Sequence, residues 1–245
     1  MDRRSPGFTL IELIIVIGII AIVAAISIPN LLASKLNANE TAAIATMRHI
    51  VSSQAQIAAT ARIDADRDGR GEYGTFLELS GAVGVRQGFV AGPPAASDFS
   101  RKGELLNPPI LSSLFARVDA NGFTTKAGYA FLLYLPDTAS PAGFVHERFD
   151  AGTVDFAGGT GRVGIDNSEA VWCAYGQPLL YGNSGNRRFF TSHRGDILHS
   201  RNDVAKAGGV GAVIQPNAAL VGSAITSPAA VGTQGGDGDT WRAAN

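Results

Sequence analysis

The stretch GFTLIELIIVIGIIAIVAAISIPN, residues 7–30, sets the architecture of the N-terminal part of this chain. Between residues 8 and 28 the only clearly polar side chains are Thr9, Glu12 and Ser27. A helix over that stretch is roughly 31 Å long at 1.5 Å per residue, which is about the hydrocarbon thickness of a bilayer. We therefore predict that it forms a membrane-spanning helix.

The flanking residues predict how the helix is oriented. Arg3 and Arg4 precede the apolar stretch, and no comparable basic cluster closes it. The positive-inside tendency therefore leaves residues 1–7 in the cytoplasm and places everything after Asn30 on the periplasmic or outer side. The apolar run is also longer than the roughly 7–15 residues of a secretory signal peptide, so we interpret it as an anchor.

Glu12 is an ionisable side chain inside this apolar stretch. An unpaired charge there costs about 2.5–3.5 kcal/mol, so such a residue is a functional-site hypothesis that needs a partner. The span itself offers none. Cleavage between Gly7 and Phe8 would create an α-amine four residues before Glu12, and a neighbouring copy could supply the same amine. The alternative is a simple anchor in which Glu12 pairs with its own Phe8 amine or reaches water.

These residues resemble the N-terminal signature of type IV pilins and type II secretion pseudopilins. The resemblance covers a basic leader that ends in Gly7, the aromatic Phe8, Glu12 as fifth residue of the mature chain, and Pro29. It implies that a prepilin peptidase cleaves after Gly7 and methylates the Phe8 amine. It further implies that Glu12 pairs with the Phe8 amine of an adjacent subunit during assembly.

The same resemblance implies a set of partners. These are membrane lipid before assembly, an inner-membrane assembly platform with its ATPase machinery, and other copies of the chain in a helical filament. Gly18 and Pro29 match positions between which the helix of assembled pilins tends to unwind. Glycine and proline are also weak points of any helix, although membrane helices tolerate both.

Residues 30–62 are predicted to continue the helix with one apolar face. No glycine or proline follows Pro29 until Gly69, so a helix from Phe8 to about Arg62 would be roughly 80 Å long. The apolar side is assigned Ile44, Met47, Ile50, Val51, Ile57, Ala58 and Ala61, and the polar side Glu40, Arg48, His49, Ser52, Ser53, Gln56 and Thr60.

Residues 63–245 are predicted to form a globular head. Three later runs have strand character, GYAFLLYLP from Gly128, EAVWCAYGQP from Glu169 and NRRFFTSHRGDILHS from Asn186, and together they predict an antiparallel sheet of about four strands. Region 63–127 is expected to be loops with one or two short helices, region 137–168 a loop, and the tail after Arg201 an extended loop with one edge strand. The expected fold class is α+β and pilin-like, with the long helix packed on the sheet.

Composition excludes several classes of function. Lys and Arg number 20 against 21 Asp and Glu, so nothing in the overall charge indicates a nucleic-acid partner. Cys173 is the single cysteine, which excludes a disulfide within the chain and a cysteine-based zinc site. We expect Cys173 to be a small buried strand residue.

One motif suggests a metal. Asp64, Asp66 and Asp68 alternate before Gly69, as in the first half of a D-x-D-x-D-G calcium loop. Glu72 occupies the ninth position, but the twelfth is Thr75 in place of the bidentate carboxylate. Calcium at these residues is one hypothesis, and a solvated turn after the long helix is the other. Oxygen ligands from Glu78, or from the tail pair Asp237 and Asp239, could complete such a site.

The glycine pattern G-x-G-x-x-G at residues 159–164 is expected to be a loop, because the strand-like run AVWCAY follows it and not a helix whose N-terminus could hold a pyrophosphate. The resemblance to pilins implies that the chain is a structural filament subunit and not an enzyme. Residues 30–50 also resemble type IV pilins, and this resemblance favours a pilus over a secretion pseudopilus. A membrane-anchored exported enzyme or binding protein is the alternative from another class.

Overall fold

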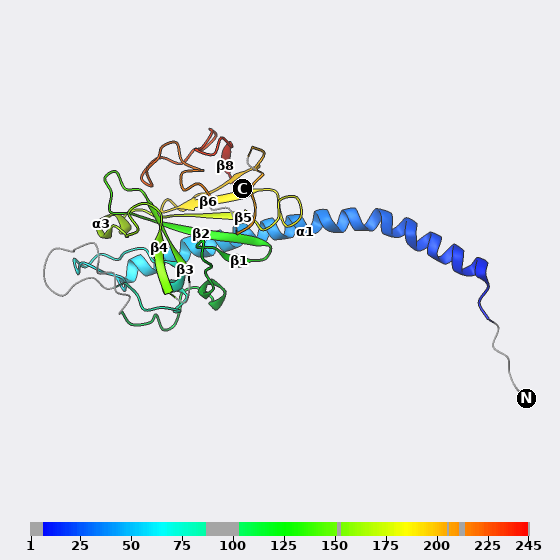
Figure 1. Ribbon diagram of the computed structural model, residues 1–245, viewed down its shortest axis with the longest axis horizontal. Helices are drawn as coiled ribbons and strands as arrows, with labels where there is room; N and C mark the ends of the chain where they lie inside the picture. The colour runs from blue at the N-terminus through cyan, green and yellow to red at the C-terminus, as the bar shows by residue number, and fades with distance from the viewer. Residues whose placement is uncertain (1–6, 87–102, 151–152, 205, 211–213, 245) are drawn as a thin grey trace, which may run out of the picture.

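The computed structural model describes residues 7–86, 103–150, 153–204, 206–210 and 214–244. Helix α1 (Leu10–Thr60) is unbroken, and its first half projects from a globular head that packs around its second half (Figure 1). The long helix is confirmed. It ends at Ala61, whose left-handed φ of 45° stops the helical hydrogen bonding.

The head is built on an antiparallel sheet with strand order β4-β3-β2-β5-β6-β7-β8, and β1 also pairs with β2. Two short helices, α2 (Phe76–Leu79) and η1 (Ser113–Ala116), lie between α1 and the first strand, and a third, α3 (Ile165–Ser168), lies between β4 and β5. The strands are β1 (Thr124–Lys126), β2 (Tyr129–Pro136), β3 (Phe144–Asp150), β4 (Thr153–Ala157), β5 (Cys173–Pro178), β6 (Arg188–Ser192), β7 (Ile197–Ser200) and β8 (Trp241–Ala243).

Strand β2 shows how the sheet separates two cores. It is buried along its whole length, and successive side chains of a strand point to opposite faces. Phe131 and Leu133 pack with the helix residues Met47 and Ile50 on one face. Leu132 and Tyr134 pack on the other face with residues of the C-terminal tail. The head therefore has three layers: α1 with the segment after it, the sheet, and the tail.

The Gly- and Ala-rich tail forms the third layer. The Tyr134 hydroxyl donates to the Ile214 carbonyl at 2.8 Å, and the Tyr175 hydroxyl donates to the Pro216 carbonyl at 2.8 Å. Arg188 of β6 binds both Asp237 and Asp239, the second at 2.6 Å. The expected edge strand is β8. The extended segment before it covers a face of the sheet, which the residue pattern did not predict.

The predicted strand runs are confirmed as β2, β5, and the pair β6 and β7 with Gly195 in the turn. Cys173 lies in β5 and is buried, as expected. The prediction of a loop over 137–168 is wrong, because β3 and β4 lie there. The charged residue Glu147 interrupts the apolar pattern of β3, yet it is buried because its carboxylate accepts the Leu77 backbone N–H at 3.0 Å.

His146 of β3 makes stability depend on pH. Its ring lies edge-on to Tyr134 with centroids 5.4 Å apart, and its Nδ1 has no hydrogen-bond partner among the described residues. Burial, and next to it the charge of Arg148, lowers the pKa of His146 from 6.5 to about 4. The unfolded chain therefore binds a proton between pH 6.5 and 4 that the folded chain does not bind.

We expect the head to lose up to about 3 kcal/mol of unfolding free energy from this group as the pH falls from 6.5 to 4. The measurement is urea unfolding of the full chain in detergent micelles, followed by fluorescence of the buried Trp172 and Trp241. His146→Gln should remove this slope, whereas His49→Gln, at an exposed position on α1, should keep it. Equal slopes in the wild type and His146→Gln would contradict the assignment.

Candidate functional site

The N-terminal motif is a capped helix start. Thr9 is the N-cap of α1, and its Oγ1 accepts the Glu12 backbone N–H at 3.3 Å. Glu12 reaches back, and its Oε2 accepts the Thr9 backbone N–H at 2.9 Å and the Thr9 hydroxyl at 2.7 Å. This capping box satisfies N–H groups that have no partner in the first turn, and it places a negative charge at the positive end of the helix.

Gly7 and Phe8 precede this cap outside the helix, and the Phe8 side chain is 81% exposed. A cut between them would free an α-amine on the residue directly before Thr9. The Glu12 carboxylate contacts no cation among residues 7–86. Its hydrogen bonds within the chain are therefore to the uncharged N–H and hydroxyl groups of Thr9.

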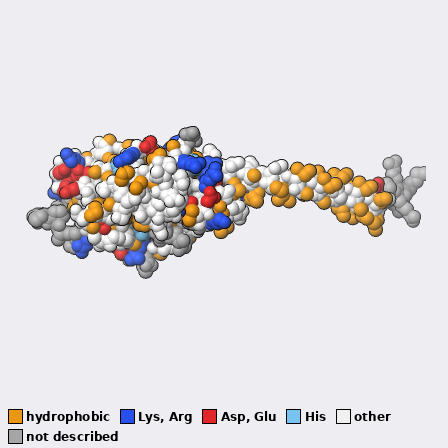
Figure 2. Space-filling model, turned by 90° about the horizontal axis from the view of Figure 1, so that it is seen from above, with side chains coloured by type: hydrophobic (Ala, Val, Ile, Leu, Met, Phe, Trp, Pro, Cys, Tyr) orange, Lys and Arg blue, Asp and Glu red, His pale blue; other side chains and the backbone are white. Residues whose placement is uncertain are grey.

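The first half of α1 presents apolar side chains to its surroundings on every side. It is the one helix among the described residues that is long and apolar enough to cross a membrane, and no part of its apolar window is buried in the head. Figure 2 shows this apolar surface along the projecting helix. The large exposed side chains are Phe8, Leu10, Ile11, Leu13, Ile14, Ile15, Val16, Ile17, Ile19, Ile20, Ile22, Val23, Ile26, Ile28, Leu31 and Leu32.

Gly18 and Pro29 both lie inside α1, and the helix runs through them without a break. A Cβ added at Gly18 would meet no atom within 4 Å, so the single chain gives no packing reason for glycine there. Unwinding between the two positions in a filament stays a prediction.

Glu40 fixes the point where α1 leaves the head, and the prediction that it faces water is wrong. Its Oε2 lies 3.1 Å from Nε of Arg187, and its Oε1 accepts the backbone N–H groups of Asn186 and Arg187 at 3.0 and 3.3 Å. The buried stripe runs 40, 43, 47, 50, 54 and 57, at three- and four-residue steps. That helical spacing could have placed Glu40 on the buried face, but its charge led us to assign it to the polar side. Ser53, also assigned to the polar side, is buried beside this stripe.

The three aspartates of the calcium hypothesis come together. One carboxylate oxygen of each of Asp64, Asp66 and Asp68 lies within 4.8 Å of the others. Asp64 Oδ1 is buried and has no hydrogen-bond partner within the described part of the chain. Other oxygens of the cluster accept backbone N–H groups of Asp68, Gly69 and Arg70, which is also how such residues close an ordinary turn. Calcium binding here stays a prediction.

The other acidic residues considered for that site lie elsewhere. Glu72 turns into the head, where its carboxylate accepts the Ala65 N–H at 2.6 Å and the Ser168 hydroxyl at 2.9 Å. Burial raises the pKa of Glu72 against the opposing charge of Arg86. Arg86 also binds Glu78, with Nε 2.9 Å from Oε1, so Glu72 and Glu78 flank one buried cation. Asp237 and Asp239 bind Arg188 on the far side of the sheet.

The glycine pattern at 159–164 is a loop, as expected. Asp137 organises this loop, because its carboxylate accepts the backbone N–H groups of Gly143 at 2.6 Å and Thr160 at 3.1 Å. Gly159 has a φ of 44°, and a Cβ there would collide with that carboxylate. The glycines therefore serve a tight turn.

Comparison with known proteins agrees with the N-terminal geometry. Residues 2–28 match the family described as the prokaryotic N-terminal methylation motif. The chain is 56% identical over 52 residues to the type IV wide pilus major component PilA4 of Thermus thermophilus. That match covers 21% of this chain and 40% of the relative, so the chain spans less than half of the relative's length. No solved structure gives a significant match. The motif and the 52-residue similarity show that part of this chain resembles a type IV pilin, and this likeness is consistent with the long helix packed on an antiparallel sheet.

Proposed function

We propose that this chain is the structural subunit of a type IV pilus-like filament assembled from the inner membrane. The observation that carries the proposal is the first half of α1, which is apolar on every side, unburied by its own head, and interrupted by one carboxylate at its start. Such a surface needs lipid around it first and other protein afterwards. Copies of the same helix, packed side by side, provide that cover.

In this proposal the leader of residues 1–7 is cytoplasmic and the head is periplasmic before assembly. A prepilin peptidase cleaves after Gly7 and methylates the new Phe8 amine. That cation then neutralises Glu12 of an adjacent subunit within the filament core. The pairing gains strength there because water is excluded. An inner-membrane platform and its ATPase supply the work of extracting the helix from lipid.

The first residue of the mature protein distinguishes a processed filament subunit from a protein that uses the helix only as a membrane anchor. Mass analysis of the protein purified from its native host is expected to show a chain that begins with N-methylated Phe8. A chain that still begins at Met1 would instead support a membrane-anchored exported enzyme or binding protein.

Recovery of the chain in filaments sheared from the cell surface is expected for a pilus. If the chain is correctly processed but stays in the cell envelope, the result would favour a type II secretion pseudopilus.

A further inference from the structure

The end of the head from which α1 emerges is formed by segments that are far apart in the sequence. The loop between β5 and β6 surrounds the helix there, with Asn39 Nδ2 donating to the Ser184 carbonyl at 2.8 Å. Strand β7 ends at the same place, because its Ser200 pairs with Arg188 at the start of β6. We call this end, residues 179–187 and 200–204 with Lys206 and with Arg242 of β8, the collar.

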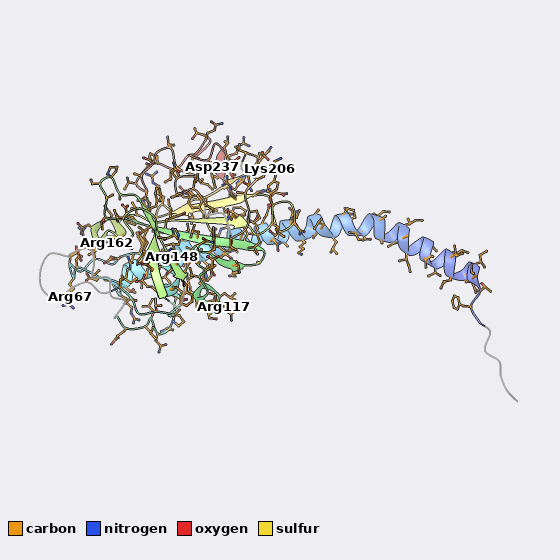
Figure 3. All side chains as sticks on the ribbon, in the orientation of Figure 1. Arg67, Arg117, Arg148, Arg162, Lys206 and Asp237 are labelled. Atoms are coloured by element: carbon orange, nitrogen blue, oxygen red, sulfur yellow. The ribbon has the colours of Figure 1, made fainter. Side chains whose placement is uncertain are left out.

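Basic side chains gather on the collar. Arg187, Arg242 and Arg201 all lie near His199, and burial, followed by these three positive charges, lowers the pKa of His199. Arg201 and Arg242 are exposed and form no ion pair with any described residue, and with His199 they line a hollow of about 290 Å³. Figure 2 shows basic groups massed where the helix leaves the head, and Figure 3 places Lys206 on the same side.

The acidic residues of the collar do not cancel this charge. Glu40 is buried and bound to Arg187, and Asp203 is an exposed carboxylate that lines the hollow. Asp239, which also lines it, is tied to Arg188 and to the backbone N–H groups of Asp203 and Val204, each at 3.1 Å. These bonds hold the basic loop in a fixed shape.

Apolar side chains project beside the basic ones. Leu180 is 61% exposed, Tyr181 37% and Val204 66%, and all three belong to the collar. Basic residues interleaved with an exposed tyrosine and aliphatic side chains are characteristic of protein surfaces that rest at the boundary between lipid and water.

The position of the collar along α1 also places it close enough to the membrane to contact lipid head groups. The run of large exposed apolar residues on α1 ends at Leu32, and Glu40 lies about 12 Å further along the helix. The head-group layer of one leaflet is roughly 5–8 Å thick. Long arginine and lysine side chains cover the remaining distance. Lys35, exposed on α1, lies within that layer.

We propose that the collar docks the head onto anionic phospholipid head groups while the subunit waits in the membrane, through Arg201, Arg242 and Lys206 with Leu180 and Val204 entering the interface. The inference rests on the proposed membrane orientation. Docking holds the head in one rotational setting about α1, so that every waiting subunit offers the same face to the filament.

The test uses the full chain at one copy per nanodisc. A Leu180→Cys variant carries an environment-sensitive fluorophore, and Arg162→Cys, at the opposite end of the head in Figure 3, is the control label site. Cys173 is 1% exposed and should not label, and the labelled wild type checks this. The emission is compared between discs that contain phosphatidylglycerol and discs of phosphatidylcholine alone.

The label at Leu180 is expected to shift to the blue in phosphatidylglycerol discs only. Arg201→Glu with Arg242→Glu should abolish the shift, because each arginine at an anionic surface changes the ratio of docked to undocked heads roughly fivefold. Arg62→Glu with Arg117→Glu changes the net charge equally at exposed positions outside the collar and should leave the shift intact.

Equal emission in both lipids, or a shift that survives the collar charge reversals, overturns the inference. A shift seen only with two or more copies per disc also overturns it, in favour of contact with another subunit. Co-elution of the chain with the nanodiscs tests separately whether α1 inserts into the bilayer. Failure to co-elute would count against the proposed function, whereas co-elution without the shift would count against lipid docking alone.

Discussion

Glu12→Gln is expected to reduce incorporation of the chain into filaments to background, although the N-terminus of α1 keeps its cap. Glutamine can still accept the Thr9 N–H and hydroxyl hydrogen bonds that Glu12 Oε2 now accepts, so the capping box survives. The variant removes only the negative charge that would pair with the Phe8 amine of another subunit. Sheared filaments from cells that carry this variant as the sole copy of the chain, quantified by immunoblot, provide the measurement.

The matched control is Thr9→Ala, which removes the cap and keeps the charge. Loss of an N-cap costs about 1 kcal/mol of helix stability, which is small for a helix as long as α1. Thr9→Ala is therefore expected to assemble, and Glu12→Gln is not. The reverse order, with filaments from Glu12→Gln and none from Thr9→Ala, would show that Glu12 acts only as a capping residue.

Arg86→Met is expected to destabilise the head by about 3–5 kcal/mol, because it leaves buried carboxylates without their cation. Arg86 is fully buried, binds Glu78 at 2.9 Å, lies 3.6 Å from Glu72 and donates to the Tyr73 carbonyl. Urea unfolding of the full chain in detergent, followed by tryptophan fluorescence, measures the loss. Arg70→Met is the surface control, since the Arg70 side chain is 77% exposed, and should cost less than about 1 kcal/mol.

The loss of stability in Arg86→Met is also expected to depend on pH. Burial already raises the pKa of Glu72, and loss of Arg86 removes the charge that opposes this rise. The folded variant should therefore take up protons at a higher pH than the unfolded chain does, so the difference in stability between variant and wild type should shrink as the pH falls toward 4.5. A difference that is independent of pH would mean that the loss comes from packing and not from the buried carboxylates.

The sequence predicted what depends on local pattern. The apolar stretch, its glutamate and the runs that became β2, β5, β6 and β7 all bury or expose side chains with a regular period, and such periods can be read without knowing the partner. Gly7, Phe8 and Glu12 were singled out through the resemblance of residues 7–30 to the pilin signature, and the methylation motif matches residues 2–28. Their roles stay a prediction.

What the sequence did not predict depends on partners distant in the chain. Glu40 is buried because Arg187 meets it, and Glu147 because α2 offers it a backbone N–H. Both residues look like solvent-facing charges in their own segments. Glu40 was therefore assigned to the wrong side of α1, and Glu147 hid the strand pattern of β3. The tail presents the same problem, since a run of glycine and alanine has no period that indicates which surface it will cover.

The central claim is that Glu12 exchanges its local contact for a neighbour's amine when the filament forms. In the single chain the carboxylate lies 2.9 Å from the Thr9 nitrogen of its own cap. The most direct measurement is a cryo-EM map of the assembled filament at side-chain resolution. The account predicts the Phe8 nitrogen of one subunit within about 4 Å of the Glu12 carboxylate of another, the ordinary span of an ion pair. Density that joins Glu12 only to Thr9 or Phe8 of its own chain would contradict it.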